Sequence, residues 1–206
     1  MQMQNEPPDP ILQLKVVTGL SKLSQVMKTQ AWKGATPQRL TPTQGQILRR
    51  LHTAKRGLPL SQLATDLGIT AATASDAVSM LVKKQLVVKT RDPQDGRQLQ
   101  ITLSPTGIQE AEKALEWTDF LSQAVGTLDA AEQGVLLQTL MRLIQVLQHN
   151  GQIAPVHMCF NCAFFRPNTY ADPQAPHHCQ FIGAALKVQE LQLDCPDHQK
   201  LPVLSE

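Results

Sequence analysis

Residues 60–103, LSQLATDLGITAATASDAVSMLVKKQLVVKTRDPQDGRQLQITL, decide the fold that we predict for this chain. In residues 60–68 the apolar side chains recur at helical spacing, and Gly68 stands where a helix ends. Thr70 is placed as the N-cap of a second helix over residues 71–85. Because only three residues, GIT, form the turn, the two segments predict a helix-turn-helix.

The second helix is expected to have two different faces. Its apolar stripe consists of Ala74, Ala77, Val78 and Leu81. The polar side chains that point away from this stripe are Thr73, Ser75, Asp76 and Ser79. Together with Thr70, they form the face that we expect to meet base edges in a DNA major groove.

Two β-rich runs follow this helix, LVVKT at residues 86–90 and RQLQITL at residues 97–103. The segment between them contains Pro and Asp-Gly, which favour a turn, so the runs predict a hairpin. Lys89, Arg91 and Arg97 gather on it, where long cations can reach phosphates or an adjacent minor groove. The predicted fold class is therefore mainly α with a small β-hairpin wing, a winged helix-turn-helix.

Three segments also resemble the MarR family of multiple-antibiotic-resistance regulators: LTPTQGQIL at residues 40–48, LSQLATDLGIT at 60–70, and LVKKQLVVKTRDPQDGRQLQITLSPTG at 81–107. The resemblance covers roughly residues 10–150 and implies a dimeric winged-helix transcription factor. It also implies that Asp95 is linked to Arg97 and that Arg97 enters the minor groove.

The chain departs from the family pattern at three positions. Gln85 stands where the family usually has Gly, and Gly96 replaces an Arg that often precedes the wing Arg. Asp76 lies near the start of the recognition helix, where the family commonly has Arg. We therefore expect modest base readout and a large share of phosphate and shape recognition.

Composition is that of a globular protein, with 206 residues, 42% hydrophobic and 17% charged. No stretch approaches 18 uninterrupted apolar residues, and the segment MQMQNEPPDP is neither basic nor apolar. We therefore expect a soluble, cytoplasmic protein without a membrane partner.

Charge is unevenly distributed along the chain. Residues 38–104 contain ten Lys or Arg against four Asp or Glu, whereas the rest contains nine basic against thirteen acidic residues. A positive middle between acidic ends suits a polyanion, because phosphate contacts and counterion release supply much of the affinity for DNA. The predicted partner is double-stranded DNA.

Long amphipathic helices flank this middle. Apolar residues recur at helical spacing over residues 11–27, and Gly34 and Pro37 are expected to break that helix. Capping boxes are predicted at Thr41–Gln44 and at Asp129–Glu132. A long helical stretch is expected from Pro105 through residue 125. The predicted domains are residues 1–37, 38–104, 105–151 and 152–206.

The helix predicted over residues 129–150 is apolar on more than one face and needs burial on two sides. We therefore predict a two-fold homodimer built from residues 11–27 and 129–150, with a monomeric helical bundle as the alternative. Two reading heads related by a two-fold axis would bind a pseudo-palindromic operator. The family resemblance also implies a small-molecule effector site between the dimer helices and the winged domain.

All four cysteines lie in the last quarter of the chain: Cys159, Cys162, Cys179 and Cys195. In a cytosolic chain, clustered thiols point to a metal or to redox chemistry rather than to disulfides. A C-x-x-C turn can place two sulfurs on one ion, so we predict a four-cysteine metal site. Free structural or redox cysteines are the alternative.

Two cofactors fit this pattern, an iron–sulfur cluster and Zn²⁺. The irregular spacing and the Cys195–Pro196 pair resemble iron–sulfur ligation, and four of the five Phe lie near the cysteines in sequence. Zinc is the commoner cofactor of small Cys-rich appendages. The preference is slightly for iron–sulfur. The nearby histidines are placed outside the ligand set: His157, His177, His178 and His198.

The sequence thus predicts a DNA-binding regulator, most simply a repressor, whose four-cysteine site stabilises the fold or senses redox, iron or metal status. A winged-helix protein-interaction scaffold with a structural zinc is the alternative. An enzyme is not expected, because a zinc deaminase needs an H-x-E motif that is missing before Cys159, and four thiolates would close the metal shell.

Overall fold

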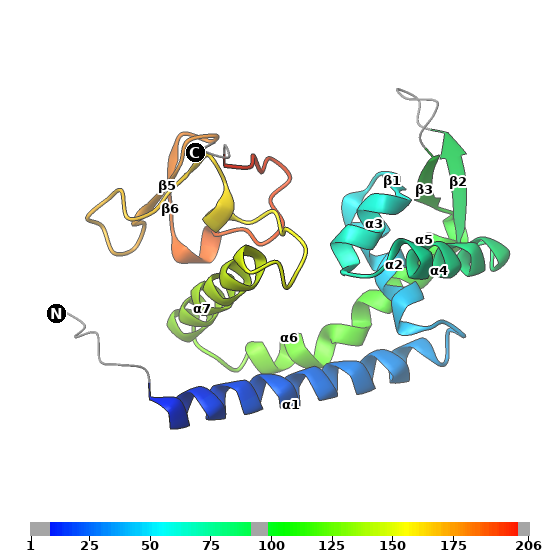
Figure 1. Ribbon diagram of the computed structural model, residues 1–206, viewed down its shortest axis with the longest axis horizontal. Coiled ribbons are helices and arrows are strands. Elements are labelled where there is room, and N and C mark those ends of the chain that lie inside the picture. Colours follow the sequence, from blue (N-terminus) through cyan, green and yellow to red (C-terminus); the bar gives the residue numbers. More distant parts are fainter. Residues whose placement is uncertain (1–8, 92–98, 202–206) are drawn as a thin grey trace. The chain divides into compact units, whose positions relative to one another are not determined.

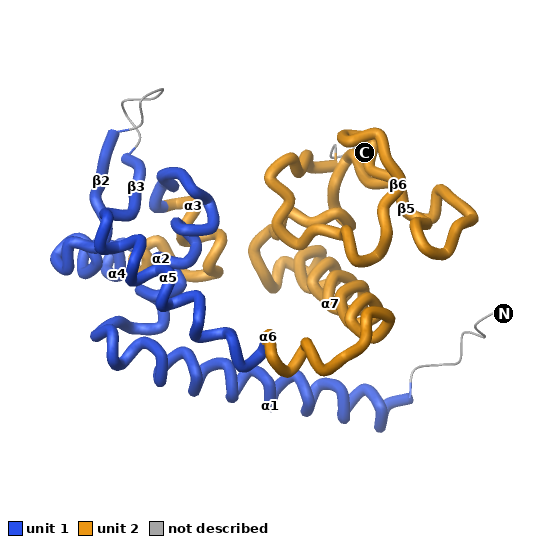
Figure 2. The backbone as a smooth tube through the Cα atoms, turned by 180° about the vertical axis from the view of Figure 1, so that it is seen from behind, with its two compact units in different colours: residues 1–60, 75–121 blue, residues 61–74, 122–206 orange. Residues whose placement is uncertain are grey.

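The structure is a computed structural model that describes residues 9–91 and 99–201. It divides into two compact units, the first made of residues 1–60 and 75–121 and the second of residues 61–74 and 122–206 (Figure 2). None of the helices in the described ranges is both long and apolar enough to cross a membrane.

Helix α1 (Pro10–Ala35) is one uninterrupted helix, drawn in blue in Figure 1. It begins where the Asp9 carboxylate accepts a 2.8 Å hydrogen bond from the backbone N–H of Ile11. The prediction that Gly34 breaks this helix is wrong, because the helix continues through Gly34 to Ala35. The missing Cβ of Gly34 leaves room for the Trp117 ring, so this contact holds the last turn in place.

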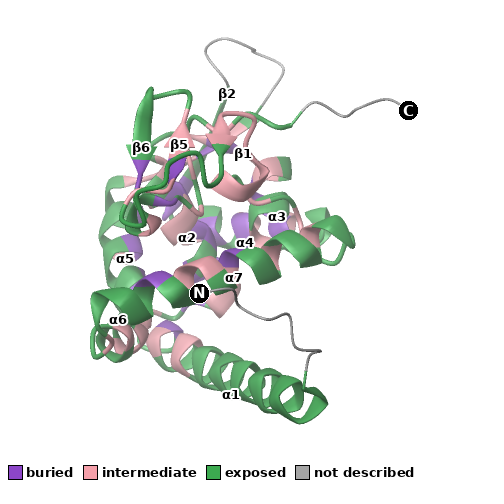
Figure 3. Ribbon diagram, turned by 90° about the vertical axis from the view of Figure 1, so that its left-hand side faces the viewer, coloured by how far each residue is buried: buried purple, intermediate pink, exposed green. Residues whose placement is uncertain are grey.

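Helix α1 is exposed over most of its length, including its apolar side chains (Figure 3). The exposed apolar residues are Ile11, Leu12, Leu14, Val16, Val17, Leu20, Leu23, Val26, Met27 and Trp32. An apolar surface of this extent on one helix calls for a partner surface.

Three shorter helices follow: α2 (Pro42–Ala54), α3 (Leu60–Leu67) and α4 (Ala71–Lys83). The predicted capping box at α2 is confirmed, since the N–H of Gln44 donates to the Thr41 hydroxyl and the Gln44 side chain accepts from the N–H of Thr41. Gly68 ends α3 in the left-handed region, with φ of +61°. Gln85 follows α4 in the same region, with φ of 57°.

The wing is a three-stranded sheet in the order β1–β3–β2. Strands β2 (Val87–Arg91) and β3 (Leu99–Leu103) pair antiparallel from Val87↔Leu103 to Arg91↔Leu99. They confirm the predicted hairpin. The sequence did not reveal strand β1 (Leu58–Pro59), which pairs with the other edge of β3. An edge strand tolerates Pro59 because its missing N–H need not join the ladder.

Helix α5 (Pro105–Leu115) is capped by Ser104, whose hydroxyl accepts from the N–H of Gly107 at 2.9 Å. The long helical stretch predicted from Pro105 to residue 125 is present, but it is not a single α-helix. A 3₁₀ turn, η1 (Glu116–Thr118), separates α5 from α6 (Asp119–Val125). At this turn the Trp117 indole N–H donates to the side-chain Oε1 atom of Gln38 at 2.9 Å.

Helix α7 (Ala130–His149) begins with the predicted capping box, in which Asp129 accepts from the N–H of Glu132 and Glu132 accepts from the N–H of Asp129. The Cys-rich segment after it forms a small sheet in the order β4–β5–β6. Its elements are η2 (Cys159–Asn161), β4 (Phe165–Arg166), β5 (His177–Cys179), β6 (Ala184–Leu186) and η3 (Val188–Glu190). We call residues 152–201 the Cys-rich module.

The Cys-rich module shares a buried apolar core with α7. Met141 of α7 and Met158 are both fully buried, and Leu191 is 5% exposed. Leu137 and Ile144 of α7 pack against the same core. Burying a Met or Leu side chain contributes about 1.5–3 kcal/mol, so this core fixes the module on the helix.

Candidate functional site

The first candidate site lies on α4. Thr70 caps the helix as predicted, because its hydroxyl accepts from the N–H of Thr73 at 3.1 Å and lies 2.9 Å from the Thr73 hydroxyl. The residues of the predicted apolar stripe are all buried: Ala74, Ala77, Val78 and Leu81. The two-faced character of this helix is therefore confirmed.

The opposite face of α4 is polar and accessible. Thr70, Thr73 and Asp76 are exposed, while Ser75 and Ser79 are half-buried. These side chains are short hydrogen-bonding groups, a type that can contact base edges or phosphates. No Lys or Arg occurs on α4 before Lys83.

The wing supplies the long cations. Lys89 and Arg91 are both exposed on β2. They are two residues apart on a strand, so they project from the same face of the sheet. Asp95 and Arg97, which were predicted at the wing tip, lie outside the described residues.

Lys84 has a different role from these exposed cations. Its ammonium group donates to the Gln44 side-chain oxygen at 2.8 Å and to the carbonyl of Arg39. Lys84 therefore ties the end of α4 to the start of α2. The helix-turn-helix followed by a hairpin with exposed cations defines the winged-helix class of DNA-binding proteins.

Comparison with known proteins specifies the family. The chain belongs to the MarR family, whose model matches residues 40–99. A probable transcriptional regulator from Pseudomonas aeruginosa is 33% identical, with a TM-score of 0.51, and the match covers 62% of this chain and 96% of that one. No curated protein matches the chain.

Staphylococcus aureus MepR is a second relative. In its DNA-binding conformation it is 26% identical, with a TM-score of 0.59, and the match covers 64% of this chain and 98% of MepR. Its complex with DNA matches with 26% identity and a TM-score of 0.56, over 64% of this chain and 97% of MepR. More than a third of this chain therefore has no counterpart in either structure.

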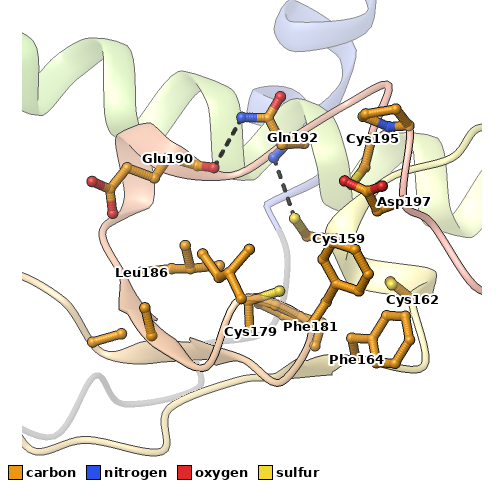
Figure 4. A pocket seen from close by; sticks show the side chains of 15 residues that line it. Cys159, Cys162, Phe164, Cys179, Phe181, Leu186, Glu190, Gln192, Cys195 and Asp197 are labelled. Atoms are coloured by element: carbon orange, nitrogen blue, oxygen red, sulfur yellow. Dashed lines mark hydrogen bonds between the residues drawn. The ribbon is translucent and has the colours of Figure 1, made fainter.

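The second candidate site is a cavity of about 480 Å³ in the Cys-rich module. All four cysteines line it, although they come from separate segments: η2, the residue after it, the end of β5 and the loop after η3. Most of the other wall residues are apolar, and Phe164, Phe181 and Leu186 among them are labelled in Figure 4. Phe165 and Ile182 also belong to this wall. Three of the four phenylalanines that lie near the cysteines in sequence line this cavity, and Phe160 does not.

Backbone hydrogen bonds fix the segments that carry the thiols. The N–H of Gln192 donates to the Cys159 sulfur at 3.3 Å, and the N–H of Cys159 donates to the Gln192 carbonyl at 3.1 Å. The N–H of Cys195 donates to the carbonyl of His157 at 2.7 Å. Burial raises the pKa of the Cys159 and Cys195 thiols, and the other thiols act in the same direction.

The histidines make contacts elsewhere. His157 stacks on His198 with ring centroids 4.9 Å apart, and the Nδ1 atom of His177 accepts from the N–H of Asn168. His178 lies 2.9 Å from the Tyr170 hydroxyl. The wall of the cavity contains no histidine among the residues that the structure describes.

Sequence reasoning missed a polar network in the first unit. The side-chain oxygen of Gln38 accepts a hydrogen bond from the Trp117 indole N–H, and the side-chain NH₂ of Gln38 donates to the Glu110 carboxylate at 2.6 Å. Lys113 donates to the same carboxylate at 2.7 Å. Gln38 is 72 positions from Glu110 and 79 from Trp117, so no local pattern could have signalled these two contacts. The Glu110–Lys113 pair is three residues apart on one helix, and that spacing is a local signal that was not used.

Proposed function

We propose that this chain is a homodimeric transcriptional repressor that binds a pseudo-palindromic operator, with a four-cysteine site that senses redox, iron or metal status. The observation that carries the DNA-binding part is the capped, two-faced helix α4 followed by a strand with two exposed cations. Membership of the MarR family also supports DNA binding. MepR, to which this chain is similar, has been crystallised with DNA.

In this proposal α4 enters the major groove. Its face of Thr70, Thr73, Ser75, Asp76 and Ser79 meets base edges and nearby phosphates. Lys89 and Arg91 contact phosphates, while Arg97, linked to Asp95, reaches into the minor groove. Since α4 offers few cations, much of the binding free energy comes from the wing and from counterion release.

The dimer is proposed from the apolar faces of α1 and α7. Leu20, Leu23 and Met27 of α1 are 40–50% exposed. Val135 and Val146 of α7 are 66% and 57% exposed. A second copy of the chain would bury these surfaces and set two α4 helices about 34–36 Å apart, one turn of DNA. A dimer seated across an operator excludes other proteins from that DNA, which is why we propose repression.

The sensing role follows from how the Cys-rich module is attached. Gln145 of α7 donates to the carbonyl of Phe160, the residue after Cys159, at 2.9 Å. The Asn161 amide lies 3.3 Å from the Gln148 side-chain oxygen of α7. A cofactor held by Cys159 is therefore connected to a proposed dimer helix through contacts of η2.

A small-molecule effector site is proposed at a cavity of about 460 Å³ in the first unit. Lys33, Trp117 and Phe120 are among its wall residues, so it offers aromatic surface beside a cation.

The test measures DNA binding by fluorescence anisotropy, with fragments that the purified chain selects from a random-sequence library. Arg91→Ala and Arg97→Ala should each weaken binding and reduce the slope of log affinity against log salt by about 1. Lys187→Ala, which removes an exposed cation from the Cys-rich module, is the matched control and should change neither quantity. A chain that shows no salt-sensitive retention on DNA would support the protein-interaction scaffold instead.

Repression itself is measured by transcription in vitro from a template that carries the selected site. Added protein should lower the yield of transcript, and the Arg91→Ala variant should lower it less. An increase in transcript would refute the repressor assignment while leaving DNA binding intact.

A further inference from the structure

The four thiols share one cavity but do not converge on one point. Figure 4 shows the sulfurs of Cys159, Cys162 and Cys179 at separate places around the cavity. Across residues 9–91 and 99–201, no group of three or more His, Cys, Asp or Glu side chains is arranged to hold a single metal ion. The four cysteines therefore line a common cavity instead of directing their sulfurs at the position of a single ion.

A zinc ion requires a tighter arrangement than this. Zinc–sulfur bonds are about 2.3 Å long, so two sulfurs on one zinc lie at most about 4.6 Å apart. The cavity that the thiols line has a volume of about 480 Å³, which is more than one ion with direct ligands needs. A polynuclear cofactor fits better, because its own atoms fill the space between the ligands.

The way the four sulfurs are paired also distinguishes clusters with two irons from clusters with four. A [2Fe–2S] cluster takes two thiolates on each iron, so its four ligands form two close pairs. A [4Fe–4S] cluster takes one thiolate on each iron, and its four ligands stand apart. In Figure 4 the Cys159 sulfur is directed toward the backbone N–H of Gln192, whereas the Cys162 sulfur lies at another place on the cavity wall. The two C-x-x-C sulfurs therefore do not point toward one another as a pair on one iron would.

The wall of the cavity has the chemistry that such a cluster needs. Phe164 and Phe165, which are half-buried, and the more exposed Phe181 present apolar surface to the cavity, and apolar surroundings help control solvent access to a cluster. The backbone N–H of Gln192 already donates to the Cys159 sulfur, and hydrogen bonds of this kind tune iron–sulfur clusters.

We propose that Cys159, Cys162, Cys179 and Cys195 bind a [4Fe–4S] cluster, each thiol losing its proton as its sulfur bonds one iron. The proposal rests on the sensing role proposed above and names the cofactor that would be sensed. It does not depend on DNA binding, so the two can fail separately.

The experiment uses the full chain, purified without oxygen and then reconstituted with sulfide and equal amounts of ferrous and ferric iron. Iron, acid-labile sulfide and zinc are measured per chain, together with visible absorption. We expect four irons and four sulfides per chain and a brown colour from thiolate–iron charge transfer. One zinc in a colourless chain, two irons per chain, or no uptake of iron would each overturn the proposal.

Two neighbouring residues of β5 provide a matched pair of variants. Cys179→Ser removes one cluster ligand and should lower the iron content severalfold. His178→Ala changes a residue that contacts Tyr170 and does not line the cavity, so it should keep four irons. Circular dichroism of both variants reports whether the helices remain folded, and wild-type iron content in Cys179→Ser would refute its assignment as a ligand.

Affinity for the selected DNA is measured on the same samples. A chain that binds DNA but takes up no iron would overturn only the cluster. A chain that holds four irons but ignores DNA would overturn only the regulator.

Discussion

A Cβ atom added at Gly45 would lie 2.1 Å from the Cη2 atom of Trp117. A Cβ added at Gly34 would likewise lie 2.4 Å from the Cδ1 atom of the same ring. The indole therefore sits in a notch formed by two glycines, one on α1 and one on α2. This contact joins the end of the long helix to the winged domain.

Gly45→Ala should displace the Trp117 ring and lower the free energy of unfolding by about 1–3 kcal/mol, the usual cost of overpacking. Urea denaturation measures the loss, and a Trp32→Phe background isolates the fluorescence of Trp117. Gly19→Ala is the control, since nothing lies within 4 Å of that position. It should instead stabilise the helix by about 0.5–1 kcal/mol. Equal stability changes in the two variants would contradict the notch.

Gln85→Gly should stabilise the chain by up to about 1 kcal/mol, because Gln85 adopts a φ of 57° that glycine reaches without a steric penalty. The carbonyl of Gln85 accepts hydrogen bonds from Ser104 and Thr106, and these survive the change because they use the backbone. Lys83→Gly, inside the last turn of α4, is the matched control and should destabilise by about 1 kcal/mol. Thermal unfolding of both variants tests the difference in sign.

Stability should fall on acidification partly through Glu110. The hydrogen bond from Lys113 lowers the pKa of this carboxyl, burial opposes that shift, and the bond from Gln38 adds to it. A lowered folded-state pKa stabilises the fold above the ordinary carboxyl pKa of about 4.3, and this contribution is lost as pH falls through the folded-state pKa.

Glu110→Gln removes that titration, so the free energy of unfolding should depend less on pH in this acidic range than in the wild type. Urea denaturation across the range measures the difference. Glu116→Gln, at an exposed carboxylate of η1, is the control. If the Glu110→Gln variant shows the same pH dependence of stability as the wild type, Glu110 makes no such contribution.

Leu23→Glu should dissociate the proposed dimer, because it places a charge on an apolar face of α1 that is 50% exposed in the single chain. Lys22→Glu, the adjacent residue on the polar side of α1, introduces the same group and should leave the mass unchanged. Light scattering coupled to gel filtration gives the mass of each variant. A monomeric wild type would remove the dimer altogether.

Local features of the fold were predictable from sequence because they depend on residues close in the chain. The capping boxes at Thr41 and Asp129 and the two faces of α4 rest on neighbouring side chains and on helical spacing. The continuation of α1 through Gly34 was not predictable, because it depends on Trp117, which is distant in sequence.

The candidate sites show the same division. The sequence identified the four cysteines as a group, but only the fold shows that they surround a cavity rather than a point. The hydrogen bond from Gln192 to Cys159 joins residues 33 positions apart, so no spacing rule announces it. The DNA-contact roles of α4 and the wing remain predictions.

Met158 and Cys159 are consecutive residues in different surroundings. Met158 is fully buried in the core on α7, and Cys159 lines the cavity. A single peptide bond joins them, so no flexible linker separates the cavity from the core, and a displacement of Cys159 would be passed directly to Met158. In a sensor of the kind proposed above, the rate of the response would be set by loss of the cofactor and not by diffusion of a flexible segment.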